Sequence, residues 1–84
     1  MSTGETCPLM VAFILVNTKI GELWNVAEEA KKIDGVRLAK AVAGRHDVVV
    51  YAEANNMSWI ICRLHGIKGV VSTESLIALE AKFE

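Results

Sequence analysis

The 84-residue sequence predicts an α+β fold in which a four-stranded antiparallel sheet carries two helices on one face. Four apolar stretches have the length and composition of strands. Two segments between them repeat apolar residues at the i, i+3, i+4, i+7 spacing of one helix face. The order is therefore strand, helix, strand, strand, helix, strand. Right-handed crossovers place both helices on the same face of the sheet, which is the ferredoxin-like arrangement.

The first strand is expected at residues 9–16, an unbroken run of eight apolar residues that ends at Asn17 and Thr18. Such a run predicts a strand that is covered on both faces. Two helices cover only one face of the sheet, so the other face needs a partner. We therefore expect a homodimer formed through the sheet or its edge.

Apolar stripes locate the two helices. The stripe of the first helix consists of Leu23, Val26, Ala27, Ala30 and Ile33, and that of the second of Met57, Ile60, Ile61 and Leu64. On the first helix Glu28 and Lys32 stand at the favourable i, i+4 spacing. Gly35 suits the left-handed position that ends this helix, and Asn55 or Asn56 can cap the start of the second.

The remaining strands are expected at residues 36–43, 48–54 and 70–79. Residues 44–47, Gly-Arg-His-Asp, join the first two of these and have the composition of a hairpin turn. Residues 1–8 are interpreted as a flexible start and 81–84 as a tail. The last strand opens with polar residues 72–75 inside an apolar segment, which fits either a solvent-facing edge or a ligand site.

Composition excludes several classes of protein. The net charge of −1 leaves no electrostatic footprint for direct contact with nucleic acid. A longest apolar run of eight residues is too short to cross a membrane. Two cysteines, Cys7 and Cys62, make no disulfide framework and fit a reducing cytoplasm. The 52% hydrophobic content is high for so small a domain and again favours an apolar face buried against a copy of the chain.

Neither a metal site nor an enzyme is indicated by the reactive side chains. Cys62 and His65 stand three residues apart, but no second closely spaced pair completes a metal site, and Cys7 lacks a Cys-x-x-Cys partner. No phosphate-cradling glycine loop or nucleophile elbow is found, so we expect no cofactor. Trp24 and Trp59 lie beside the helical stripes, either covering the edge of the core or anchoring a subunit contact.

Across residues 11–79 the sequence resembles the stand-alone ligand-binding domain, or RAM domain, of the Lrp/AsnC (feast/famine) transcription regulators. The matching motifs occur in order and at the family's spacing. They are Val16-Asn17-Thr18 with Gly21, Gly35-Val36, Ala41-Val42-x-Gly44-x-x-Asp47-Val48, Glu53-Ala54 and Gly69-Val70-x-Ser72-Thr73-Glu74-Ser75-Leu76-Ile77.

This resemblance implies a RAM domain at residues 9–81 whose sheets pack into dimers and assemble further into tetramers or octamers. It implies an amino acid effector bound between neighbouring dimers, and possible contact with full-length regulators of the family. We expect no helix-turn-helix domain, such as those regulators carry, within these 84 residues. His46 departs from a frequent aromatic residue, Ile20 from a frequent proline, and Ser75 stands where threonine is common.

Carried over residue by residue, the expected effector site consists of Gly44, Arg45, His46, Asp47, Thr73 and Ser75. The Asp47 carboxylate can accept from the ammonium of an amino acid, and backbone N–H groups at Gly44 can receive its carboxylate. Arg45 can add a fork-shaped contact, and the hydroxyls of Thr73 and Ser75 can complete the site.

Three alternatives stay open. One is a small enzyme of the dimeric α/β-barrel, monooxygenase-like kind, which needs a deep pocket between helices and sheet. Another is a purely structural oligomerisation module that binds no ligand. The third, an ACT-type regulatory domain, has the same order of elements, but residues 69–77 favour the Lrp/AsnC version.

Overall fold

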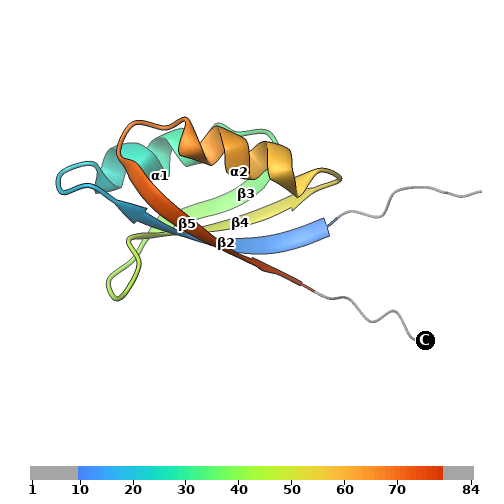
Figure 1. Ribbon diagram of the computed structural model, residues 1–84, viewed down its shortest axis with the longest axis horizontal. Coiled ribbons are helices and arrows are strands. Elements are labelled where there is room, and N and C mark those ends of the chain that lie inside the picture. Colours follow the sequence, from blue (N-terminus) through green and yellow to red (C-terminus); the bar gives the residue numbers. More distant parts are fainter. Residues whose placement is uncertain (1–9, 79–84) are drawn as a thin grey trace, which may run out of the picture.

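The computed structural model describes residues 10–78 and has the predicted order of elements (Figure 1). These elements are β2 (Met10–Thr18), α1 (Leu23–Lys31), β3 (Val36–Ala41), β4 (Val48–Ala54), α2 (Met57–His65) and β5 (Val70–Ile77). The strands form one sheet in the order β3-β4-β2-β5, and every neighbouring pair is antiparallel. Both helices cover the same face of this sheet (Figure 1). The ferredoxin-like fold is thus confirmed.

Strand boundaries differ from the prediction at three places. β2 continues two residues past Val16, to Thr18. β3 ends at Ala41 rather than at residue 43, because the amide of Val42 donates to the carbonyl of Asp47 at 2.8 Å and closes a loop there. β5 ends at Ile77. The predicted flexible start at residues 1–8, Leu9 and residues 79–84 lie outside the described part of the chain.

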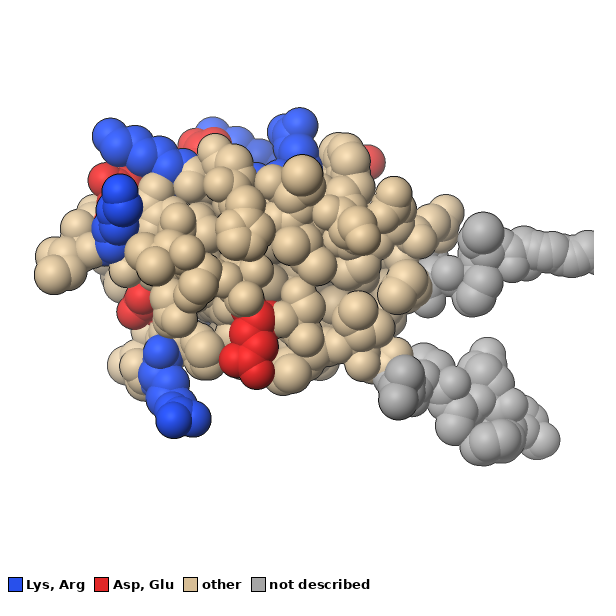
Figure 2. All heavy atoms as spheres, in the orientation of Figure 1, with Lys and Arg blue, Asp and Glu red and all other residues tan. Residues whose placement is uncertain are grey.

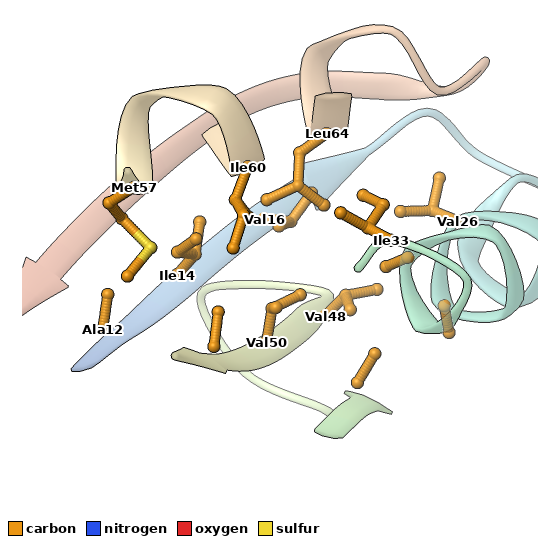
Figure 3. Packing of buried hydrophobic residues seen from close by; sticks show 14 residues of the cluster. Ala12, Ile14, Val16, Val26, Ile33, Val48, Val50, Met57, Ile60 and Leu64 are labelled. Carbon is orange, nitrogen blue, oxygen red and sulfur yellow. The ribbon is translucent and has the colours of Figure 1, made fainter. Parts of the chain in front are cut away.

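The core fills the space between the helices and the sheet. Within residues 10–78 it consists of fourteen apolar side chains exposed by 6% or less, and no polar side chain is buried with them. Figure 3 shows Met57, Ile60 and Leu64 of α2 pointing onto alternate residues of β2 and β4. The enzyme alternative required a pocket with polar groups in this space, and the apolar packing gives it no support.

The helix ends show which local signals the fold uses. α1 ends at Lys31, so Ile33 reaches the core from the following turn rather than from the helix. Gly35 has a φ of 100°, the left-handed conformation expected there. Of the two candidate caps for α2, Asn56 is used, since its side-chain oxygen accepts from the Trp59 amide at 3.3 Å.

The charges and tryptophans of the helices lie at the surface. Lys31 pairs with Glu28 and Lys32 with Glu29 at i, i+3, in place of the expected i, i+4 pair of Glu28 and Lys32. Such exposed pairs contribute little to stability. Trp24 is 71% exposed, which does not fit a side chain that covers the core edge. The Trp59 ring lies 5.5 Å from the Arg63 guanidinium.

The second face of the sheet has no cover from the other elements within residues 10–78. Successive residues of a strand point to opposite faces, so the neighbours of the buried core residues face away from the helices. We call this second surface the open face; its apolar members are Val11, Phe13, Leu15, Leu38, Val49, Tyr51 and Leu76. Phe13 is 45% exposed and packs on Tyr51 with ring centroids 5.1 Å apart. Within one chain the helices cover one face of the first strand, and the expected cover of its other face by a second copy stays a prediction.

Candidate functional site

Asp47 fastens the loop between β3 and β4 to the end of β2. Its Oδ2 accepts from the backbone amide of Thr18 at 2.8 Å and from the Thr18 hydroxyl at 3.3 Å. The Asp47 amide in turn donates to the carbonyl of Val16 at 2.9 Å. These three bonds join residues 29 or more positions apart in the sequence. The carboxylate is therefore a structural clamp as well as a candidate ligand group.

The glycine of the same loop is open to solvent. Gly44 has a φ of 144°, and a Cβ built there would meet nothing within 4 Å. Arg45 beside it is exposed. Figure 1 shows this loop projecting from the sheet on the side away from the helices. The backbone at Gly44 is thus accessible to a molecule that approaches from outside.

His46 connects the loop to two strands. Its Nδ1 lies 3.3 Å from Oδ1 of Asn17, and its Nε2 lies 3.8 Å from Oε1 of Glu74. Asn17 donates from Nδ2 to the Ser72 hydroxyl at 3.1 Å. Asn17 and Glu74 were not among the site residues predicted from the sequence. Successive strand residues point to opposite faces of the sheet. This alternation could have shown that Ser72 and Glu74 face away from the side on which Thr73 and Ser75 lie.

Thr73 and Ser75 lie on the other face of the sheet. In the register of β2 and β5, Thr73 is opposite Val16 and Ser75 is opposite Ile14, both of which point to the helices. The Thr73 hydroxyl lies 3.0 Å from Nε2 of His65 on α2. The six predicted residues therefore form two groups within one chain. The loop residues lie at the end of β2, and the two hydroxyls lie beside α2.

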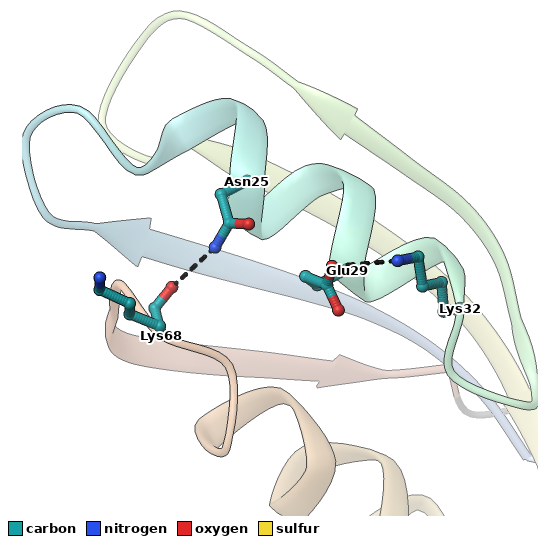
Figure 4. Close-up of polar contacts among 4 residues, drawn as sticks. All are labelled: Asn25, Glu29, Lys32 and Lys68. Atoms are coloured by element: carbon teal, nitrogen blue, oxygen red, sulfur yellow. Dashed lines mark hydrogen bonds and ion pairs between the residues drawn. The ribbon is translucent and has the colours of Figure 1, made fainter.

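A groove of about 690 Å³ lies between α1 and α2 and contains none of the six predicted residues. It is lined by Asn25, Glu29, Lys32, Ile33, Cys62, Arg63, Gly66, Ile67 and Lys68. Asn25 bridges its two walls by donating to the Lys68 carbonyl at 3.2 Å, and Lys32 pairs with Glu29 at 3.1 Å (Figure 4). In the view of Figure 2, Lys and Arg side chains gather over the helices, whereas charged side chains stand singly on the lower side of the molecule.

Metal-ligating side chains do not cluster in the described residues. Cys62 is an exposed free thiol, and His65, three residues on, contacts Thr73 instead. Residues 10–78 contain no group of three or more His, Cys, Asp or Glu side chains that could hold a metal ion. In the same range no helix is long and apolar enough to span a bilayer. Cys7 lies outside the described residues.

Solved structures share this fold, although no family model and no curated protein matches the sequence. A Thermus thermophilus protein, TTHA0845, is 20% identical with a TM-score of 0.81, over 89% of this chain and 99% of that one. FFRP-DM1 is 26% identical with a TM-score of 0.75, over 83% and 99%. Escherichia coli AsnC is 19% identical with a TM-score of 0.75, over 89% of this chain and 54% of AsnC.

Two further regulators with this fold were solved with L-methionine. They are a transcriptional regulator of Neisseria meningitidis and a feast or famine regulatory protein of M. tuberculosis, with TM-scores of 0.71 and 0.70. They are 21% and 17% identical to this chain. Each match covers 89% of this chain and 53% of the regulator. The chain thus spans nearly all of TTHA0845 and FFRP-DM1 and about half of AsnC and of the two regulators solved with L-methionine. The resemblance to Lrp/AsnC regulators inferred from the sequence is confirmed at the level of the fold.

Proposed function

We propose that this chain, which has the fold of the RAM domain of Lrp/AsnC regulators, is an amino-acid-binding and oligomerisation module of transcription regulation. The observation that carries the proposal is the clamped loop at residues 44–47. Asp47 holds it to the end of β2 while Gly44 leaves its backbone accessible. Two proteins of the same fold, both regulators, were solved with L-methionine, which supports an amino acid as the ligand.

Each end of a free amino acid finds a chemically suitable partner in the proposed site. Asp47 uses Oδ2 for Thr18, and we propose that Oδ1 accepts from the ammonium. Backbone N–H groups at Gly44 receive the carboxylate, with Arg45 as an additional donor. His46, held against Asn17 and Glu74, borders the same site and faces the ligand side chain.

The two groups of predicted residues make one site only when two chains meet. Thr73 and Ser75 lie beside α2 and are separated by the sheet from the loop of their own chain. We therefore place the effector between neighbouring dimers, with the 44–47 loop of one chain and the two hydroxyls of another. The ligand then favours whichever assembly contains this shared site, from tetramer to octamer.

We propose that the chain regulates transcription through the way its subunits assemble and not by catalysing a reaction. Dimers form through the open face of the sheet, whose apolar surface is otherwise exposed to water. The module acts in the cytoplasm by joining regulators of the same family, and those partners contact the DNA. We propose no catalytic reaction and no cofactor.

Calorimetric titration with the twenty L-amino acids, L-methionine first, tests the proposal. At least one of them is expected to release or absorb heat, and Asp47→Asn is expected to weaken that binding by about tenfold or more, because it removes the charge that faces the ammonium. Asparagine keeps an oxygen for the Thr18 amide, so the loop stays clamped. Asp34→Asn, the same change at an exposed loop position, serves as the control.

The outcomes separate the sensor from its alternatives. Unchanged binding by Asp47→Asn would limit Asp47 to its structural bonds and contradict the proposed contact with the ammonium. A folded oligomer that gives no heat with any amino acid would be a structural module without an effector.

A further inference from the structure

The open face carries opposite charges at its two edges, in one cross-strand row. Lys40 of β3 is opposite Val49 of β4, Val49 is opposite Leu15 of β2, and Leu15 is opposite Glu74 of β5. Both charged side chains are exposed, and the two between them are apolar and half-buried. A cation and an anion therefore lie at equal distances from the centre of the face.

The next row of the open face has no charge. Leu38, Tyr51, Phe13 and Leu76 follow one another across the four strands. The two central strands thus carry apolar residues in both rows. At the edges, Leu38 lies next to Lys40 on β3, and Leu76 lies next to Glu74 on β5. A partner that fits this surface needs an apolar centre, with a negative group over Lys40 and a positive group over Glu74.

A second copy of the chain meets this requirement in only one of two orientations. A two-fold axis between the sheets and parallel to the strands places β3 over β5 of the second copy and β4 over β2. An axis across the strands places β3 over β3 and β5 over β5, so that edges of like charge meet. Because a two-fold interface uses the same surface on both copies, the row pattern selects the first orientation.

We infer that the open faces of two copies pack with the two-fold axis parallel to the strands, and that Lys40 of each copy pairs with Glu74 of the other. The inference rests on the dimer in the proposed function and specifies how it is arranged. Phe13 of one copy then packs against Tyr51 of the second, and Leu38 against Leu76. In its own chain, Glu74 also has His46 Nε2 3.8 Å from its Oε1.

Simple dimensions allow the proposed ion pairs. At a strand spacing of about 4.8 Å the edge strands lie about 7 Å to either side of the middle of the sheet, and facing sheets are about 10 Å apart. The usual rotation of about 30° between packed sheets displaces the facing edges by only about 4 Å. Extended Lys and Glu side chains can bridge this distance. Arg37 stays with Glu53 of its own chain, 3.3 Å away in another row.

Charge reversal tests the arrangement by sedimentation velocity over a dilution series at low salt. Lys40→Glu and Glu74→Lys are each expected to raise the dimer dissociation constant about tenfold, since each places like charges together at two symmetric sites. The double variant, with both reversals, is expected to return to within about threefold of the wild type. Lys31→Glu, Glu28→Lys and their combination reverse an exposed pair on the helical side and are expected to change nothing.

The contrary results are equally specific. If both single reversals leave the dimer unchanged while Phe13→Glu separates it, the open face is the interface but the axis does not run along the strands. If the double variant dissociates as readily as the single ones, Lys40 and Glu74 do not pair. A wild-type chain that stays monomeric would overturn both this inference and the proposed dimer, whereas amino acid binding is measured separately.

Discussion

Gly35 shows how a single residue controls where α1 is joined to the sheet. Its φ of 100° is a conformation that side-chain-bearing residues rarely adopt. A Cβ at this position would also lie 2.9 Å from Ile60 Cδ1 and 3.0 Å from the Glu53 carbonyl, which leaves no room for it. The Gly35 carbonyl meanwhile accepts from the Glu53 amide at 2.8 Å. The backbone therefore approaches β4 closely only because this residue has no side chain.

Gly35→Ala is expected to lower the free energy of unfolding by about 2–3 kcal/mol, from backbone strain and steric conflict together. Gly21→Ala is the matched control, because Gly21 has a φ of 89° but nothing within 4 Å of its Cβ position. It isolates the strain alone, at about 1 kcal/mol. Urea denaturation of both variants measures the two costs. Equal losses in the free energy of unfolding would show that the residues around Gly35 accommodate the added methyl group without further destabilisation.

At the scale of one element, α2 combines a local cap with a buried stripe. Asn56 caps its first turn, and Met57, Ile60 and Leu64 are exposed by 3% or less. Ile61, the fourth residue of the predicted stripe, is only partly buried at the edge of the core. The cap and the stripe together set the rotation of α2. That rotation places His65 beside Thr73 of the last strand.

Asn56→Ala is expected to destabilise the protein by about 1 kcal/mol, because the Trp59 amide loses its side-chain acceptor at the start of the helix. The adjacent Asn55→Ala changes an exposed asparagine outside the helix and is expected to cost less than about 0.5 kcal/mol. Thermal and urea unfolding followed by circular dichroism give both values. A larger loss in Asn55→Ala would mean that the cap is assigned to the wrong residue.

For the whole molecule, the decisive feature is a small sheet with one apolar face that no other element of residues 10–78 covers. A domain of this length buries only about 60–65% of its unfolded surface and gains modest stability from folding alone. Phe13, Leu38 and Leu76 remain 44–50% exposed on the open face. Covering them with a second copy adds apolar burial that one chain lacks, so we expect folding and dimerisation to be coupled.

The coupling predicts that the melting temperature of the wild type rises with protein concentration. Phe13→Glu places a charge at the centre of the open face and is expected to melt at a lower, concentration-independent temperature. Trp24→Glu alters a side chain that is 71% exposed on the helical side and is expected to keep the wild-type behaviour. If Trp24→Glu alone abolished the concentration dependence, the subunit contact would lie at α1.

Repeating patterns within short segments were sufficient to predict the architecture. The helical stripes, the apolar strands and the order of elements predicted the sheet with two helices on one face, and Gly35 predicted the left-handed turn after α1. Such signals are local: burial on one side of a helix or strand imposes a period that appears directly in the residues. The motifs at residues 16–18, 44–48 and 69–77 similarly indicated the family fold.

The candidate site was predictable only as a set of residues, because its arrangement depends on register between distant strands. Whether Thr73 faces the helices or the open face depends on its pairing with Val16, 57 positions earlier, and a shift of one residue would reverse it. The bond from Asp47 to Thr18 likewise exists only once β2 and β4 are adjacent. The row that joins Lys40 to Glu74 requires all four strands in place. Local preference thus determined which elements form, and tertiary pairing determined which side chains meet, because contacts between distant segments leave no period in the sequence.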